Sequence, residues 1–171
     1  MEEADPTPNP SFMRSRLLNT TREFCAALIS PPSPSDLLSK FFRPDNPRIT
    51  EHGPSWASSR LPFLGETFAG VQGCVKYFEV LSEVLEMSLP EDAFPGADGF
   101  VVDTDSGGNS EGARKGMVSV VGKGTFKSKK TGKGWDEEFI YRFSDFDEEG
   151  RIGHWEIWAD PLSAWVAVGG E

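Results

Sequence analysis

Apolar residues recur at helical spacing in the first half of the chain, and this spacing predicts three helices. In the first, over Ser11–Ile29, one face collects the positions i, i+4, i+7 and i+11, which are Leu17, Thr21, Phe24 and Leu28. A short second helix is predicted over Pro34–Phe42, with Ser33 as its N-cap. The third spans Val71–Met87 and carries a broad apolar stripe, so we expect it to be the central helix that packs across a sheet.

Alternating apolar and polar residues in the last part of the chain predict three successive antiparallel strands joined by tight turns. These strands span Gly124–Lys130, Trp135–Phe146 and Arg151–Asp160. Shorter strands are expected at Arg48–His52, Phe100–Asp103 and Met117–Val121. The apolar faces of the last two long strands are aromatic, with Phe139, Tyr141 and Phe143 on one and Trp155 beside Ile157 on the other. Such faces either fill a core or line an apolar pocket.

The order of the elements favours one α+β domain. Helices grouped early and strands grouped late predict helices on one face of a curved antiparallel or mixed sheet, which wraps around the long helix as a cone with a pocket at its mouth. Residues 1–10 are expected to be a disordered tail and residues 11–171 the domain. The loop Gly53–Gly70 contains several large apolar residues and is predicted to form a packed rim, whereas Thr104–Arg114 is expected to be an exposed loop.

Charge and composition narrow the range of partners. The formal net charge of −10 opposes binding to nucleic acid or to an anionic membrane, because both require clustered lysine and arginine. The chain contains no apolar run of about 18 residues and begins with an acidic segment, so a cytoplasmic location is expected. Cys25 and Cys74 are predicted to be buried reduced thiols, and no spacing of cysteine and histidine indicates a metal site.

His52 and Glu51 are the candidate catalytic residues. The ordinary pKa of histidine, about 6.5, suits proton transfer at neutral pH, and a strand end beside an apolar pocket is a suitable place for such a base. The two side chains point to opposite faces if both residues lie in the strand. Alternation from Ile49 places Glu51 inside the pocket, whereas a strand that ends early frees His52 to face it.

Two stretches of the chain resemble the SnoaL-like proteins of the nuclear transport factor 2-like superfamily. The segment Leu61–Gly70 followed by Val75–Phe78 resembles their strand–loop–helix entry, and the ending Gly150–Pro161 resembles theirs. This resemblance, carried by pattern and element order, implies a cone-shaped, cystatin-like α+β barrel. The superfamily includes cofactor-free isomerases, polyketide cyclases and dehydratases, together with members that only bind ligands or dimerise.

The resemblance implies candidate roles for several residues. His52 lies closest to the position of the base in ketosteroid isomerase, with Glu51 beside it, but helix 11–29 has no tyrosine to match that enzyme's donor. We therefore expect a cofactor-free isomerase, cyclase or dehydratase that acts by general acid–base catalysis on an apolar carbonyl compound. The residues expected to line its pocket are Trp56, Phe63, Tyr141 and Trp155, with the Tyr141 hydroxyl as a donor. The alternative is a non-catalytic ligand-binding or dimerisation module.

Alternation in the last strand also predicts a partner. If Trp155 and Ile157 face inward, then His154 and Trp158 face outward. Large exposed aromatic residues concentrate at subunit interfaces, so a homodimer through the outer face of the sheet is expected. Asp160 is expected to cap a terminal helical turn that begins at Pro161.

Overall fold

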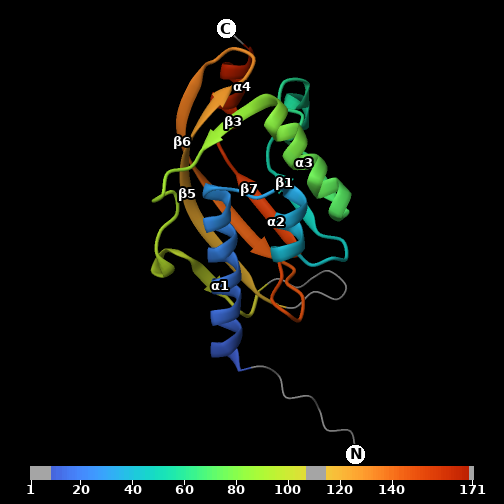
Figure 1. Cartoon of the computed structure of the whole chain (residues 1–171), viewed down its shortest axis with the longest axis vertical. Helices are drawn as coiled ribbons and strands as arrows, with labels where there is room; N and C mark the ends of the chain where they lie inside the picture. Colours follow the sequence, from blue (N-terminus) through green and yellow to red (C-terminus); the bar gives the residue numbers. More distant parts are fainter. Residues whose placement is uncertain (1–8, 107–114, 170–171) are drawn as a thin grey trace, which may run out of the picture.

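The computed structural model describes residues 9–106 and 115–169, and it shows helices packed on one face of a single sheet (Figure 1). The four α-helices are α1 (Pro10–Ile29), α2 (Pro34–Phe41), α3 (Gly70–Val84) and α4 (Pro161–Gly169). Two short 3-10 helices occupy Ser55–Ser59 and Ala97–Gly99. Most of the predicted N-terminal tail, and residues 107–114 of the predicted loop Thr104–Arg114, lie outside the described residues.

The sheet is mixed and open. Its strands are β1 (Arg48–Glu51), β2 (Thr67–Ala69), β3 (Leu85–Ser88), β4 (Val101–Asp103), β5 (Met117–Ser128), β6 (Gly134–Ser144) and β7 (His154–Trp158). Their order is β2-β1-β7-β6-β5-β3, with β4 paired to β5. Only the β1–β7 pair is parallel among the strands of the described ranges. The prediction of an α+β fold is therefore confirmed, with β2 and β3 at the open edges.

Local capping explains where the first two helices begin. The Asn9 side chain accepts a hydrogen bond from the Ser11 amide at the start of α1. At the start of α2, Ser33 Oγ accepts from the Asp36 amide and Pro34 occupies the first turn, where its missing N–H costs nothing. Both helices lie within one residue of their predicted limits.

The prediction that the third helix continues to Met87 is wrong. The helix ends at Val84, and the next four residues form β3, which pairs with Thr125–Ser128 of β5 in antiparallel register. The apolar spacing around Leu85 fits a helix and a strand equally well over so few residues. Pairing with an adjacent strand, a tertiary contact, decides between them.

The predicted strands Met117–Val121 and Gly124–Lys130 are a single strand, β5. Gly122 lies in its middle, and a Cβ atom there would stand 2.3 Å from the ring of Phe139 on β6. The glycine therefore marks a close approach of an aromatic ring to the strand rather than a break between two strands.

An aromatic cluster around Phe24 joins the helices to the sheet. The Phe24 ring of α1 is completely buried and makes edge-to-face contacts with the rings of Phe41, Phe42, Phe143 and Trp155, at centroid distances of 5.0 to 5.6 Å. Edge-to-face contacts add to the free energy gained by burying the apolar area. This cluster fixes α1 and α2 against β6 and β7.

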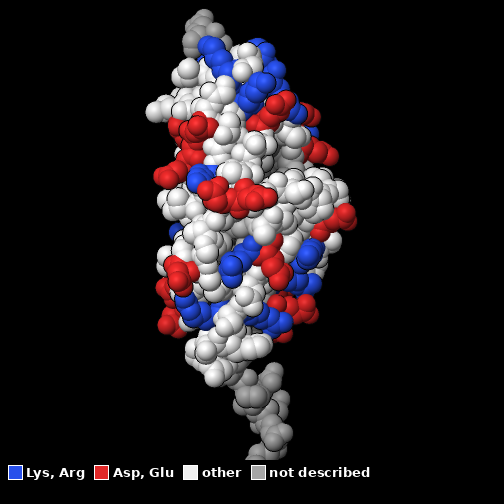
Figure 2. Space-filling model, turned by 60° about the vertical axis from the view of Figure 1, so that its left-hand side comes forward, with Lys and Arg blue, Asp and Glu red and all other residues white. Residues whose placement is uncertain are grey.

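Acidic and basic side chains are interspersed on the face shown in Figure 2, and several basic ones gather at one end of the molecule. That end carries the β5–β6 hairpin, whose exposed lysines are Lys127, Lys129, Lys130 and Lys133. Within residues 9–106 and 115–169, no helix combines the length and the hydropathy needed to cross a membrane.

Replacing Phe24 by alanine tests the central position of this cluster. We expect Phe24→Ala to lower the free energy of unfolding by about 3–5 kcal/mol, because it removes a fully buried ring and leaves a cavity. Urea denaturation measures the change. Phe12→Ala on the exposed part of the same helix is the matched control, with an expected change below about 0.5 kcal/mol. Equal effects of the two substitutions would contradict the packing described here.

Candidate functional site

An apolar cavity lies between α3, the inner face of the sheet and the start of α4. Its volume is about 50 Å³, which is room for a few water molecules. Most of its wall is aliphatic and aromatic, and the side chains of Leu61, Phe63 and Leu64 close one side. The predicted packing of the loop that carries these three residues is confirmed, because each of them is buried.

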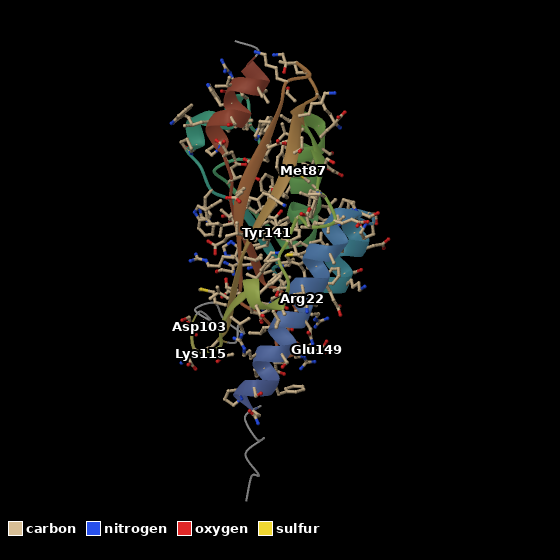
Figure 3. All side chains as sticks on the ribbon, turned by 90° about the vertical axis from the view of Figure 1, so that its left-hand side faces the viewer. Arg22, Met87, Asp103, Lys115, Tyr141 and Glu149 are labelled. Atoms are coloured by element: carbon tan, nitrogen blue, oxygen red, sulfur yellow. The ribbon has the colours of Figure 1, made fainter. Side chains whose placement is uncertain are left out.

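Five titratable side chains line the cavity: Glu51, Tyr77, Glu137, Tyr141 and Asp160. They come from β1, α3, β6 and the β7–α4 junction. Tyr141 lies in the middle of the molecule, whereas Met87, another lining residue, lies nearer the end that carries α4 (Figure 3). The cavity thus combines an apolar wall with a small number of groups that can exchange protons.

Glu51 is held in the cavity by strand alternation and by one hydrogen bond. In β1, Ile49 and Glu51 pair in register with Trp155 and Ile157 of β7, and all four side chains are buried. The Tyr77 hydroxyl of α3 donates a hydrogen bond of 3.0 Å to Glu51 Oε1. The second carboxyl oxygen is left available to a molecule in the cavity.

Burial keeps the Glu51 carboxyl neutral. Loss of solvent raises the pKa of Glu51 to about 8, against the lowering effect of the Tyr77 hydrogen bond, and the nearby charge of Glu137 raises it further. Burial also raises the pKa of Tyr77 well above 10, as does the neighbouring Glu51. At pH 7 both groups are therefore protonated, and Glu51 is a carboxylic acid that can donate a hydrogen bond or a proton.

Glu137 is a second carboxyl group in the same cavity. Its Oε2 atom accepts a hydrogen bond of 2.8 Å from the Asp160 amide, and the indole of Trp135 lies beside it without the geometry of a hydrogen bond. Burial raises the pKa of Glu137 to about 7, and the charge of Asp160 contributes to the rise. Asp160 caps α4 by accepting from both the amide and the hydroxyl of Ser163, so its predicted capping role is confirmed.

Three of the four predicted pocket residues line the cavity: Phe63, Tyr141 and Trp155. The Trp155 Nε1 atom is buried and has no hydrogen-bond partner within the described parts of the chain. Burial raises the pKa of the Tyr141 hydroxyl well above 10, so this group is a neutral donor. An unpaired buried donor of this kind costs free energy.

Trp56 does not line the cavity. It lies in the 3-10 helix at Ser55–Ser59, with 66% of its surface exposed, and packs edge-on against Trp165 of α4. The short helical turn points this residue away from the sheet, which loop composition did not predict.

His52 lies on the opposite side of the sheet from Glu51. Its Nε2 atom is 3.0 Å from Glu156 Oε1, and its ring stacks on Trp158 at 4.3 Å between centroids. Arg142 donates two hydrogen bonds to the same Glu156 carboxylate. Burial opposes ionisation of Glu156, but the hydrogen bonds from Arg142 and His52 hold its pKa below the usual value. The geometry brings Glu51, not His52, into the cavity.

Two cavity residues escaped the sequence-based prediction, although the sequence carries a signal for each. Glu137 stands two positions before Phe139, so extending the alternation of the β6 aromatic face places it inside. Tyr77 stands three positions after Cys74 and four before Leu81, on the same helical stripe. No group of three or more potential metal ligands occurs in residues 9–106 and 115–169.

The buried Glu51 carboxyl makes the stability of the protein depend on pH. The unfolded chain loses this proton near pH 4.5 and the folded protein near pH 8, so its stabilising contribution is complete below 4.5 and is lost as pH rises to 8. Glu51→Gln keeps an acceptor for Tyr77 and cannot ionise. We therefore expect the variant to gain up to about 5 kcal/mol relative to the natural protein between pH 4.5 and 8.5. Urea denaturation at several pH values measures this gain.

Glu138→Gln is the matched control for this prediction, because Glu138 is exposed on the outer face of β6. Its stability difference from the natural protein should stay constant across the pH range. A constant difference for Glu51→Gln as well would show that the Glu51 carboxyl is not held neutral by the fold.

Comparison with known proteins supports the fold rather than a named activity. No protein-family description matches the chain, and no curated protein is similar to it in sequence. A nuclear transport factor 2-like protein from Burkholderia xenovorans LB400 is 18% identical and superposes with a TM-score of 0.64, covering 91% of this chain and 97% of that one. A protein from Jannaschia sp. CCS1, named provisionally as a SnoaL-like polyketide cyclase, is 14% identical with a TM-score of 0.61, covering 98% and 99%.

A third solved structure has a ligand in its name. TerC, co-crystallised with polyporic acid, is 15% identical with a TM-score of 0.62, covering 90% of this chain and 98% of that one. These superpositions establish a common fold, whereas sequence identities this low leave the activity open. The chain therefore has the nuclear transport factor 2-like fold, the fold also found in proteins named as SnoaL-like.

Proposed function

We propose that this protein is a cofactor-independent isomerase, cyclase or dehydratase that acts by general acid–base catalysis on an apolar carbonyl compound. The observation that carries the proposal is a neutral carboxylic acid, Glu51, held by Tyr77 in the wall of an apolar cavity. A carboxyl group with its pKa near the working pH is suited to transferring protons in both directions.

The chemistry follows from where negative charge develops. When a carbon next to a carbonyl loses a proton, charge moves onto the carbonyl oxygen. A buried acid beside that oxygen stabilises the resulting enol far better than water does. The free carboxyl oxygen of Glu51 is placed for this contact, and Tyr77 fixes the orientation of the group. The Tyr141 hydroxyl is a further neutral donor in the same wall.

The names of solved structures with this fold support the proposal that this protein acts on a small organic molecule. The names of the solved structures include a polyketide cyclase and TerC with polyporic acid. The wall of the cavity in this chain is apolar and aromatic, which favours an apolar molecule with few polar atoms.

The small volume of the cavity supports a second candidate function. At about 50 Å³ the cavity admits a few waters, and a ring system has to displace apolar side chains to enter. Met87 at the wall is half exposed and flexible, so it can move at little cost. A module that binds a partner protein or dimerises through its surface, without chemistry, would need no internal cavity for a ligand.

Proton exchange distinguishes the two candidates without knowledge of the natural substrate. We expect the protein to speed the exchange of the α-protons of 2-tetralone, an apolar ketone, for deuterium in D₂O. The Glu51→Gln variant should be slower by about 100-fold, because the developing enolate loses its acid. Proton NMR at pD 7 follows the loss of the α-proton signals.

Two further variants sharpen this test. Glu138→Gln, on the outer face, should exchange at the natural rate. A large loss in His52→Ala with none in Glu51→Gln would move the acid–base role to the histidine. No exchange above the buffer rate in the natural protein would favour the non-catalytic module.

We also propose that a second copy of this chain covers the outer face of the sheet. Val121, Ile140 and Trp158 are cross-strand neighbours on β5, β6 and β7, and all three are more than a third exposed. Beyond this apolar row lie basic and acidic groups, among them Lys123 and Glu138, which a two-fold axis can bring into complementary pairs. The self-complementary mixture of charges favours a homodimer over a partner of a single charge sign.

A charge placed in the middle of this row tests the dimer. We expect the natural protein to have the mass of a dimer by light scattering and Ile140→Lys to shift it to a monomer, because an unpaired charge would be buried at the interface. Val166→Lys, at an exposed apolar position on α4, should leave the mass unchanged. A monomeric natural protein at millimolar concentration would refute this interface.

A further inference from the structure

The cavity contains two carboxyl groups that are the only side chains in its wall able to change protonation between about pH 6 and 9. Its five titratable residues are Glu51, Tyr77, Glu137, Tyr141 and Asp160. The pKa values of both tyrosines lie well above 10, so they stay neutral, and the hydrogen bonds from Ser163 lower the pKa of Asp160, so it stays ionised. Glu51 and Glu137 remain as the exchangeable pair.

The surroundings of the two carboxyl groups differ in a way that assigns their roles. Glu51 receives its hydrogen bond from a phenol in a fully buried position. Glu137 receives its hydrogen bond from a backbone amide at the start of α4 and is less buried, so its ionised form is better supported. When the environments of two carboxyl groups give them different pKa values in this way, one group can serve as the acid of a reaction and the other as its base.

We propose that Glu137 is the base and Glu51 the acid of one two-carboxyl site, and that the site takes an apolar molecule with a carbonyl oxygen at the Glu51 end and an acidic C–H bond at the Glu137 end. This assignment rests on the proposed function, and it adds the residue that removes the proton from carbon.

The proton transfers balance within the pair. The Glu137 carboxylate removes the proton from carbon while Glu51 delivers its proton to the carbonyl oxygen, giving a neutral enol, a Glu51 carboxylate and a protonated Glu137. Return of the Glu137 proton to the carbon at the far end of a conjugated enol, and of the enol proton to Glu51, completes an isomerisation. Both residues recover their starting forms, and no other reactant is consumed.

The order of ionisation has a testable asymmetry. Glu137 loses its proton while Glu51 is still neutral, so replacing Glu51 removes no charge that Glu137 senses. Glu51 ionises in the presence of the Glu137 carboxylate, which raises the pKa of Glu51. We expect Glu137→Gln to lower the pH at the midpoint of the Glu51 titration by about half a pH unit or more. Glu51→Gln should change the midpoint of the Glu137 titration by no more than about 0.2 pH units. NMR titration of protein labelled with ¹³C at the glutamate carboxyl carbons measures both.

A substrate without a carbonyl group isolates the base. The ring opening of 5-nitrobenzisoxazole needs only removal of one C–H proton, because the electron pair breaks the N–O bond and leaves as a coloured phenolate. We expect the natural protein to cleave this probe faster than buffer and Glu137→Gln to be slower by about tenfold or more. The Glu138→Gln variant, next along β6 on the outer face, should keep the full rate.

The outcomes separate this assignment from the proposed function. Loss of 2-tetralone exchange in Glu51→Gln together with full cleavage of the benzisoxazole by Glu137→Gln would keep the acid–base enzyme and overturn Glu137 as its base. A Glu51 midpoint below that of Glu137, or cleavage no faster than buffer in the natural protein, would also overturn the assignment. Equal losses in Glu137→Gln and Glu138→Gln would show a general effect of charge rather than a base in the cavity.

Discussion

The interaction on which the site depends is the hydrogen bond between a buried phenol and a buried carboxylic acid, Tyr77 and Glu51. A carboxylate at the deeply buried position of Glu51 would need a positive partner, and none of the described side chains that line the cavity is basic. The neutral acid avoids that cost, and the phenol satisfies one of its oxygens. The same hydrogen bond joins α3 to β1, two elements that are far apart in the sequence.

The two faces of the sheet show how neighbours decide the state of a carboxyl group. Glu156 lies on the outer face of β7, opposite Thr50 of β1, and exposes no more of its surface than Glu51 does. Arg142 and His52 bond to Glu156 and hold it ionised, whereas Glu51 has only a neutral tyrosine. One sheet thus contains an ionised and a neutral carboxyl group a single residue apart in register.

Sequence patterns predicted the fold better than the site. Helical spacing and capping residues located α1 and α2, and alternation located β6 and β7, because spacing, caps and alternation are local signals in the sequence. The strand β3 was missed, since four residues that follow a helix become a strand only by pairing with β5. Trp56 was misplaced because the direction of a loop residue depends on a short helix that its composition does not specify. Alternation from Ile49 placed Glu51 inside, where the structure has it in the cavity wall, whereas the resemblance to ketosteroid isomerase favoured His52.

The hydrogen atom on the Glu51 carboxyl group decides whether this residue is a neutral acid. A neutron structure of crystals exchanged into D₂O near pD 6.5 would locate the deuterons in the cavity. We predict a deuteron on the Glu51 carboxyl group and another on the Tyr77 hydroxyl, directed at Glu51 Oε1. An ionised Glu51, with no deuteron on either oxygen and with a cation or a chain of waters beside it, would contradict the account.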